Sequence, residues 1–285
     1  MILSNFQFPL IGTLIIFLTA PIFTPINLTR VYLSRMIKII PLKGMPIVEE
    51  GDDIGRLIVE AAERQGTPIE DGDIIVVTHI IVSRAEGRVI DLEAVKPSEA
   101  AVRIAAYTGK DPRLVEVVLG ESRAIRRMAL GVLITETRQG FVCANSGVDK
   151  SNVPGETAVA LLPEDPDESA RRIRHRIEEL TGRRVAVIIS DTHGRPHREG
   201  EINVAIGASG IEVIRDRRGE RDLFGYMLQV KRTAVADELA SAAELVIGQA
   251  DEGIPAAIIR GYPYTPSESS RAVELVRPRG RDLFL

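Results

Sequence analysis

The sequence predicts a mixed α/β or α+β fold, and three observations support this. Segments with helical spacing of apolar residues alternate with short runs rich in β-branched residues along most of the chain. Hydrophobic residues make up 45% of the 285 residues and charged residues 27%, which is typical of a folded globular protein. No internal repeat, low-complexity segment or clear domain linker interrupts the alternation.

The first half of the alternation begins at Met36. Residues 36–41 predict a strand, and residues 49–66 predict a helix that Asp52 or Asp53 could cap. Because residues 73–83 are rich in β-branched side chains and lie between two glycines, we expect one buried strand there. The next expected elements are helices over 96–109 and 111–122, a basic turn over 123–127, and a pair of strands over 131–137 and 140–147.

The second half begins with a strong helix, which the spacing of apolar residues predicts over 166–182. A very hydrophobic strand follows over 184–192, and it ends in Asp-Thr. Residues 193–200 are basic and contain two glycines, so we expect a loop there. A helix over 235–248 and a strand over 254–261 complete the prediction.

The N-terminal 35 residues form a separate, apolar extension. Residues 1–29 carry no charge, and the apolar run at 6–23 is long enough to span a bilayer. Three prolines argue against a regular membrane helix, and the missing basic n-region argues against a secretory signal. Two interpretations stay open: a membrane anchor, or an upstream extension translated from a mis-assigned start, with the second favoured. All candidate chemistry lies in residues 36–285.

Composition excludes several classes of function. The net charge is −4 and there is no Trp, so we expect no nucleic-acid partner. A single cysteine, Cys143, cannot form an internal disulfide, which favours a reducing compartment and hence the cytoplasm. Its place in an apolar strand favours a core residue over a nucleophile. No Walker A motif is present, so a bound nucleotide would need a fold other than the P-loop, and the expected fold class is not the Rossmann type either.

Asp191 and Thr192 form the first candidate cluster, at the end of the strand predicted over 184–192. Ligands of open α/β sheets bind outside the carboxyl ends of strands, where a carboxylate and a hydroxyl can hold a hard divalent cation. Arg195 and Arg198 follow in the loop and could contact a phosphorylated ligand. A turn capped by Asp191 and a solvated basic loop account for the same residues.

Three further clusters have simpler explanations beside the functional ones. Asp149 could bind a metal, and Asn152 a ribose or phosphate, although such residues also favour plain turns. Gln249 lies in an acidic loop that could reach a metal or could simply be a surface connection. Residues 44–53 could let the backbone approach a base, and Arg84 could pair with a phosphate or with a nearby acid.

Together these clusters resemble one known family. The segments "PLKGMPIVEEGDDIGRLI", "GFVCANSGVDKSNVPGE", "SDTHGRPHREG" and "DEGIPAAIIRG" occur in the order found in the coenzyme F420-0:L-glutamate ligases, also called gamma-glutamyl ligases. The resemblance extends from Met36 to about Tyr264. It implies a two-lobed, mixed-sheet α/β structure that forms an intertwined homodimer.

The resemblance also implies a reaction. GTP would phosphorylate the lactyl carboxylate of F420-0, and the amine of L-glutamate would then attack the acyl phosphate. Further glutamates would be added through the γ-carboxyl. Two divalent cations, Mg²⁺ or Mn²⁺, would assist, and K⁺ could help, because bridging cations stabilise the charge that develops in phosphoryl transfer.

Residue by residue, the resemblance assigns two kinds of site. Asp149 and Asp191 would bind the first metal, and Thr192 and Gln249 the second. The positions that would contact GTP are Met45, Pro46, Ile47, Val48, His79, Ile80, Arg84 and Asn152.

Four positions depart from the family pattern. His193 and His197 stand where an aromatic residue is common, and Ile80 stands where a lysine or polar residue is common. Gln249 replaces a common glutamate, so we expect weaker binding of the second metal, because an amide carries no charge. Two other functions would use parts of the same pattern: a metal-dependent phosphohydrolase, and a membrane-tethered nucleotide-binding module.

Overall fold

The computed structural model describes residues 36–283. The apolar run at 6–23, and with it the choice between an anchor and a mis-assigned start, lies outside these residues. Within 36–283, no helix is both long enough and apolar enough to cross a membrane.

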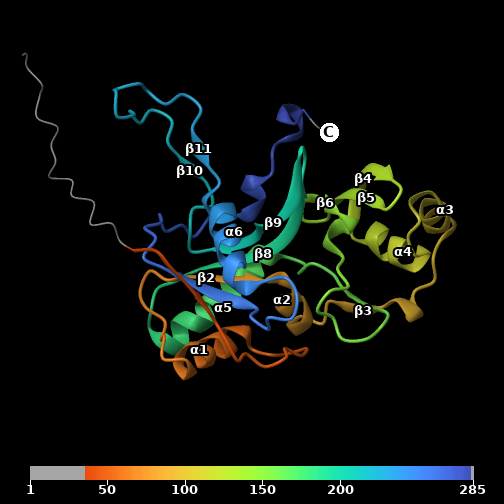
Figure 1. Ribbon diagram of the computed structural model, residues 1–285, viewed down its shortest axis with the longest axis horizontal. Helices are drawn as coiled ribbons and strands as arrows, with labels where there is room; N and C mark the ends of the chain where they lie inside the picture. The colour runs from red at the N-terminus through yellow and green to blue at the C-terminus, as the bar shows by residue number, and fades with distance from the viewer. Residues whose placement is uncertain (1–35, 284–285) are drawn as a thin grey trace, which may run out of the picture. The chain divides into compact units, whose positions relative to one another are not determined.

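A five-stranded mixed sheet forms the centre of this region (Figure 1). Its strands, in spatial order, are β1 (Lys38–Pro41), β12 (Ala256–Arg260), β2 (Ile74–Thr78), β8 (Ala186–Arg195) and β9 (Arg198–Ser209). Only β2 and β8 run parallel, and the other neighbours are antiparallel. Because helices cover both faces of the sheet, its central strands are nearly unbroken hydrophobic runs.

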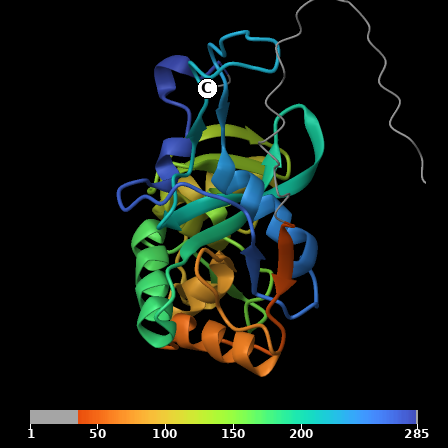
Figure 2. The same ribbon diagram turned by 90° about the vertical axis from the view of Figure 1, so that its left-hand side faces the viewer.

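Helices cover the two faces of this sheet. On one face, α1 (Ile54–Arg64) and α5 (Pro166–Thr181) pack on the alternate residues Ile75, Val77, Val187 and Ile189. On the other, α6 (Val235–Ile247) packs on Ile74, Val76, Ala186 and Ile188. Figure 2 shows α5, in green, and α6, in blue, on opposite sides of the sheet. The alternation of these residues between two buried layers follows from the two-residue period of a strand.

A second lobe inserts between α2 (His79–Ala85) and α5 in the sequence. It contains two small antiparallel sheets and two helices: β3 (Val89–Asp91) with β7 (Ala158–Ala160), β4 (Ser122–Ala129) with β5 (Val132–Thr137) and β6 (Val142–Ala144), and the helices α3 (Glu99–Thr108) and α4 (Pro112–Gly120). This lobe has a hydrophobic core of its own. The structure therefore confirms the predicted α+β architecture and its difference from a Rossmann fold.

The single strand expected over 73–83 is wrong in its second half. Strand β2 ends at Thr78, and helix α2 (His79–Ala85) follows directly. The helix buries Ile81 and Val82 in the same core as the strand. A buried strand followed by a short buried helix therefore gives one unbroken apolar run, and periodicity cannot separate the two.

The structure overturns two further expectations. Residues 123–127 belong to strand β4 instead of a turn, and its arginines lie on a partly exposed sheet face. The expected loop at 193–200 is a hairpin, in which β8 continues to Arg195 and β9 returns from Arg198. His197 takes a positive φ of 62° in the connection, so only two residues separate the paired strands. Strand β9 was missed, although Ile202, Val204 and Ile206 alternate as a strand predicts.

A long arm, residues 215–233, was also missed. It begins and ends in the two-residue strands β10 (Arg215–Asp216) and β11 (Arg232–Thr233), which pair antiparallel. In Figure 1 the arm extends away from the central sheet. Short 3₁₀ turns complete the described elements: Leu92–Ala94, Asn145–Gly147, Ala272–Leu275 and Arg279–Arg281.

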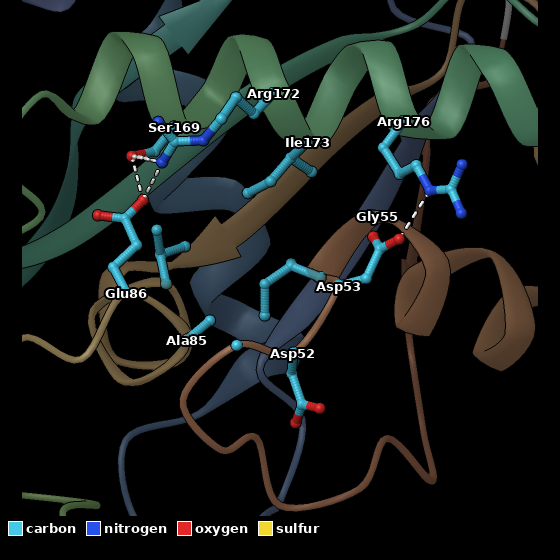
Figure 3. A pocket seen from close by; sticks show the side chains of 12 residues that line it. Asp52, Asp53, Gly55, Ala85, Glu86, Ser169, Arg172, Ile173 and Arg176 are labelled. Carbon is cyan, nitrogen blue, oxygen red and sulfur yellow. Dashed lines mark hydrogen bonds and ion pairs between the residues drawn. The ribbon is translucent and has the colours of Figure 1, made fainter.

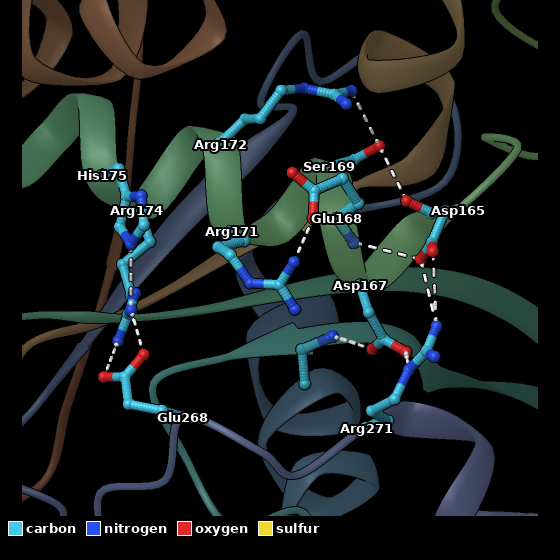
Figure 4. Close-up of polar contacts among 11 residues, drawn as sticks. Asp165, Asp167, Glu168, Ser169, Arg171, Arg172, Arg174, His175, Glu268 and Arg271 are labelled. Carbon is cyan, nitrogen blue, oxygen red and sulfur yellow. Dashed lines mark hydrogen bonds and ion pairs between the residues drawn. The ribbon is translucent and has the colours of Figure 1, made fainter.

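The N-terminus of α5 joins the central sheet to the C-terminal segment (Figure 4). The buried carboxylate of Asp167 accepts hydrogen bonds from the backbone N–H groups of Ala208, on β9, and Ala272, in the C-terminal segment. Arg271 donates to its second oxygen. At the same junction Gly207 passes so close to Pro166 that a Cβ there would lie 2.3 Å from the Pro166 carbonyl oxygen.

Candidate functional site

A cavity of about 310 Å³ opens beside the end of the one parallel strand pair. Thr78 and Ser190 are register partners where β2 and β8 reach this edge, and both line the cavity. This is the place where open α/β sheets bind ligands. All twelve residues that the sequence pattern assigned to metal or nucleotide line it: Met45, Pro46, Ile47, Val48, His79, Ile80, Arg84, Asp149, Asn152, Asp191, Thr192 and Gln249.

Asp191 is the most constrained of these side chains, with only 8% of its surface exposed. Its Oδ1 accepts from the backbone N–H of Thr192 at 2.7 Å and lies 3.2 Å from Nε2 of His79. Its Oδ2 lies 3.0 Å from Nε2 of His193. Both carboxylate oxygens are therefore held in fixed directions by the helix and the strand that meet at the cavity.

Electrostatics keep this carboxylate charged. Burial by itself would raise the pKa of Asp191, but interactions with His79 and His193 outweigh it and hold the pKa well below its ordinary value. Burial would lower the pKa of His193, yet its contacts with Asp191 and Cys143 raise that pKa to about 10. The result is a buried anion whose neighbours are hydrogen-bond donors. In the sequence alone, His193 stands out only as a departure from the family pattern.

Asp149 approaches the cavity from the second lobe. Its Oδ1 accepts from the backbone N–H of Ser151 at 2.8 Å, and its Oδ2 accepts from the Ser151 hydroxyl at 2.5 Å. Its backbone pairs with Ala160, which fixes the start of the loop against β7. Asn152 takes a positive φ of 55° and also lines the cavity. The Asx-type turn that the residue types favour is therefore present, and it presents its carboxylate to the cavity.

Thr192, on β8, and Gln249, just after α6, lie within hydrogen-bonding distance of each other. The Thr192 hydroxyl is 2.8 Å from Oδ1 of Asn203 and 3.1 Å from Oε1 of Gln249. Nε2 of Gln249 donates to Oδ1 of Asn203 and to Oε1 of Glu244, each at 3.2 Å. Asn203 could not be predicted from the sequence, because only the pairing of β8 with β9 places it opposite Thr192.

The remaining wall is suited to a nucleotide. Met45 and Val48 pack on the hydrophobic core, whereas Ile47 is exposed, so this loop offers both backbone and apolar surface. Arg84, on α2, forms no ion pair within residues 36–283 and faces the cavity. An unpaired guanidinium that lines a cavity is suited to binding a phosphate.

These residues fit hard divalent cations. Two carboxylates, a hydroxyl and an amide supply only oxygen donors, which Mg²⁺ and Mn²⁺ prefer. Within the described residues no group of three or more His, Cys, Asp and Glu side chains is arranged to hold a metal by itself. The protein donors would thus leave coordination positions for phosphate oxygens and water, as is usual for Mg²⁺.

Arg195 and Arg198 do not reach this cavity. They flank the turn of the β8–β9 hairpin, where Arg195 donates to the backbone carbonyl of Glu199 at 3.1 Å. The structure therefore separates these two residues from the other sequence-predicted positions.

A second cavity, of about 340 Å³, lies between α1, α2 and α5 (Figure 3). Both arginines that line it are paired, Arg172 with Glu86 and Arg176 with Asp53. Neither guanidinium is thus left for an anionic ligand, and the cavity beside β2 and β8 remains the candidate site.

Known proteins share this pattern. A family model described as F420-0:Gamma-glutamyl ligase matches residues 44–261. A coenzyme F420:L-glutamate ligase of Methanothermobacter thermautotrophicus is 55% identical over 249 residues, which cover 87% of this chain and 98% of the relative. Its counterpart in Methanocaldococcus jannaschii is 48% identical over 253 residues, 88% of this chain and 98% of the relative. A third, from Methanopyrus kandleri, is 51% identical over 242 residues, which cover 83% of this chain and 93% of the relative.

Proposed function

Because this chain belongs to the F420-0:gamma-glutamyl ligase family, we propose that it joins L-glutamate to coenzyme F420-0 with GTP as the energy source. The chain is a ligase of coenzyme F420 biosynthesis, as its similarity to the named ligases indicates. GTP use, the acyl-phosphate route and the roles of individual residues are our proposals. The one cysteine is consistent with a cytoplasmic enzyme.

The proposed reaction has two steps. The lactyl carboxylate of F420-0 attacks the γ-phosphorus of GTP, so that GDP leaves and an acyl phosphate forms. The amine of L-glutamate then attacks the acyl carbon, an amide bond forms, and phosphate and a proton are released. Repetition at the γ-carboxyl would extend the glutamate chain. Both steps bring anions together, which makes charge neutralisation the main task of the site.

Different residues of the chain would contribute to this charge neutralisation in different ways. Asp149 and Asp191 would hold a first Mg²⁺ or Mn²⁺, Thr192 and Gln249 a second, and K⁺ could also take part. The bound cations would neutralise phosphate and carboxylate charge as it develops. Arg84 would contact a phosphate, while His79 fixes the orientation of the Asp191 carboxylate.

The nucleotide would occupy the wall formed by the first loop and α2. Residues 45–48 would contact the base through backbone and apolar groups, with Ile80 and Asn152 beside it. One observation carries the proposal furthest. Carboxylates from two lobes, the Thr192–Gln249 pair and an unpaired arginine converge on a single cavity at the edge of the parallel strand pair.

The test is an incubation of the full-length protein with F420-0, L-glutamate, GTP and MnCl₂, analysed by mass spectrometry. We expect a product heavier by one or more glutamyl units, formed only when both GTP and metal are present. Consumption of GTP without glutamylation would instead support a phosphohydrolase. If neither reaction occurs, the replacements at His193, His197 and Ile80 become the first positions to revert.

We also propose that the enzyme works as a homodimer, and the 215–233 arm supports this. Leu223 and Phe224 at its tip are 98% and 96% exposed, and Tyr226 and Val230 are exposed as well. So many large apolar side chains on one projecting segment are typical of a protein interface.

A further inference from the structure

We infer that Glu244 and Asn203 are positioning residues that turn the amide oxygen of Gln249 and the hydroxyl oxygen of Thr192 toward one divalent cation. The inference rests on the proposed function, which places a cation at Thr192 and Gln249. Neither Glu244 nor Asn203 was assigned a role from the sequence. Their contacts explain how the neutral side chain of Gln249 can bind a cation.

Hydrogen bonds fix the orientation of the Gln249 side-chain amide. Gln249 has a donor end and an acceptor end, and only its oxygen can bind a cation. The Glu244 carboxylate can only accept hydrogen bonds when ionised, so the group 3.2 Å away must be the Gln249 NH₂. The second N–H of this NH₂ is directed to Oδ1 of Asn203 at 3.2 Å. Oε1 is therefore directed to Thr192.

The orientation of the Gln249 amide also determines which way the Asn203 amide points. If the Asn203 amide were reversed, its NH₂ would face the NH₂ of Gln249, donor against donor. Asn203 is only 2% exposed, so no bulk water is available to relieve such a mismatch. Its Nδ2 lies 3.5 Å from the Ser190 hydroxyl, and its backbone oxygen accepts from Ser241 of α6 at 2.7 Å. The orientation of Asn203 is thus fixed from both sides.

The position of the Thr192 hydroxyl proton follows from these orientations. The Thr192 hydroxyl has one hydrogen and two acceptors within reach, Oδ1 of Asn203 at 2.8 Å and Oε1 of Gln249 at 3.1 Å. The shorter contact is to Asn203, which is buried and already oriented to accept. Oγ1 of Thr192 and Oε1 of Gln249 then face each other with lone pairs and no proton between them. A cation would remove that repulsion.

The spacing of the two oxygens suits the cation. Mg²⁺ binds oxygen at about 2.1 Å in an octahedron, so adjacent ligand oxygens lie roughly 3.0 Å apart. The distance between Oγ1 of Thr192 and Oε1 of Gln249 is 3.1 Å. Glu244 also places a negative charge near the site without itself lining the cavity, which partly replaces the charge that a glutamate at position 249 would carry.

Glu244→Met is therefore expected to weaken cation binding by different amounts in two backgrounds. In the native protein, Glu244→Met leaves the Gln249 amide free to turn its NH₂ toward the cation. In a Gln249→Glu protein there is no donor end to misplace, so the same substitution removes only the charge of Glu244 and is expected to weaken cation binding less.

The experiment measures Mn²⁺ binding by titration, with free Mn²⁺ read by electron paramagnetic resonance and GDP present. We expect Glu244→Met to weaken the weaker of two sites about tenfold in the native background, a magnitude typical of outer-shell partners. Glu238→Met removes the same charge from the exposed first turn of α6 and is expected to leave both sites unchanged. Asn203→Asp keeps the acceptor and is expected to retain Mn²⁺, whereas Asn203→Leu is expected to lose the second ion.

The outcomes separate the two proposals. Equal weakening by Glu244→Met in both backgrounds, or by Glu238→Met as much as by Glu244→Met, would mean that only charge matters and would overturn the positioning role alone. Absence of a second Mn²⁺ from the native protein would overturn both this inference and the second metal site of the proposed function. Because Glu244 is only partly buried, loss of folding is not expected to obscure the comparison.

Discussion

Asp191 illustrates how much of this site depends on a single side chain. It is buried, both of its oxygens are hydrogen-bonded, and its pKa lies well below the ordinary value, so it is anionic throughout the physiological range. An isolated buried carboxylate would be neutral. The two histidines therefore make it possible for a charged carboxylate to exist at this depth in the fold.

The first prediction follows from that charge. Asp191→Asn, and separately Asp149→Asn, is expected to reduce glutamate ligation by more than about a hundredfold, since each removes one of the proposed anionic metal ligands. Asp251→Asn changes an exposed carboxylate that does not line the cavity and is the matched control. Normal turnover by either site variant, with folding confirmed by circular dichroism, would contradict the metal assignment.

The second prediction concerns pH and stability without metal. The folded-state pKa of His193 is raised from 6.5 to about 10, so its stabilising contribution is complete below pH 6.5 and is lost as pH rises through 10. The lowered pKa of Asp191 acts at the acidic end, where its contribution is lost as pH falls below 3.8. Urea unfolding with chelator should therefore show the advantage of native protein over His193→Phe shrinking between pH 6.5 and 10. A constant difference would refute the ion pair.

Residue types, together with the family resemblance, indicated which side chains gather at the site, but not how they are oriented. Asp149, Asp191 and Arg84 could be predicted because each lies in a local motif. Asn203 and Glu244 could not, since their importance comes from a strand pairing and a helix end that bring them to Gln249. Their roles, like those of the predicted ligands, are proposals that the binding experiments test.

At the scale of elements, helices with clear caps were the most predictable. Asp53, Ser98 and Asp111 cap their helices as such residues do at N-termini, and Gly109 and Gly182 end theirs in the left-handed conformation. The errors came where the tertiary fold overrides a local pattern. Helix α2 continues the apolar run of β2, and β9 begins in a segment too basic to suggest a buried sheet.

The third prediction tests the closest approach between elements. Gly207 has no special φ, but a Cβ there would meet the backbone of Pro166 at the start of α5. Gly207→Ala is expected to lower the free energy of unfolding by about 2 kcal/mol, because backbone atoms must move apart. Gly194→Ala, on the neighbouring strand, has open space and should cost much less. Equal losses in chemical denaturation would contradict this explanation.

At the scale of the whole molecule, two lobes with separate cores meet at one cavity. The sequence predicted the fold class, but it did not predict the 215–233 arm. Its strands are two residues long, and its apolar side chains have no alternation that would indicate a buried face. If the arm binds a second copy of the chain, as proposed, it needs no intramolecular pattern of this kind.

The fourth prediction tests the arm. If it forms the dimer interface, the double variant Leu223→Asp and Phe224→Asp should have about half the native mass by light scattering, with the fold of each chain retained. Leu130→Asp introduces a charge at an equally exposed leucine outside the arm and should leave the mass unchanged. A native protein that is already monomeric would refute the homodimer, and a dimer in the arm variant would refute this interface.

The pairing of β2 with β12 has a consequence for how activity arises during folding. It joins Val77 to Ala256, and the cavity takes residues from Met45 to Pro255. Contacts between such distant positions form late, because closing large chain loops has a high entropic cost. Helices and hairpins can therefore form while the site is still absent, so the recovery of ligase activity marks the end of refolding.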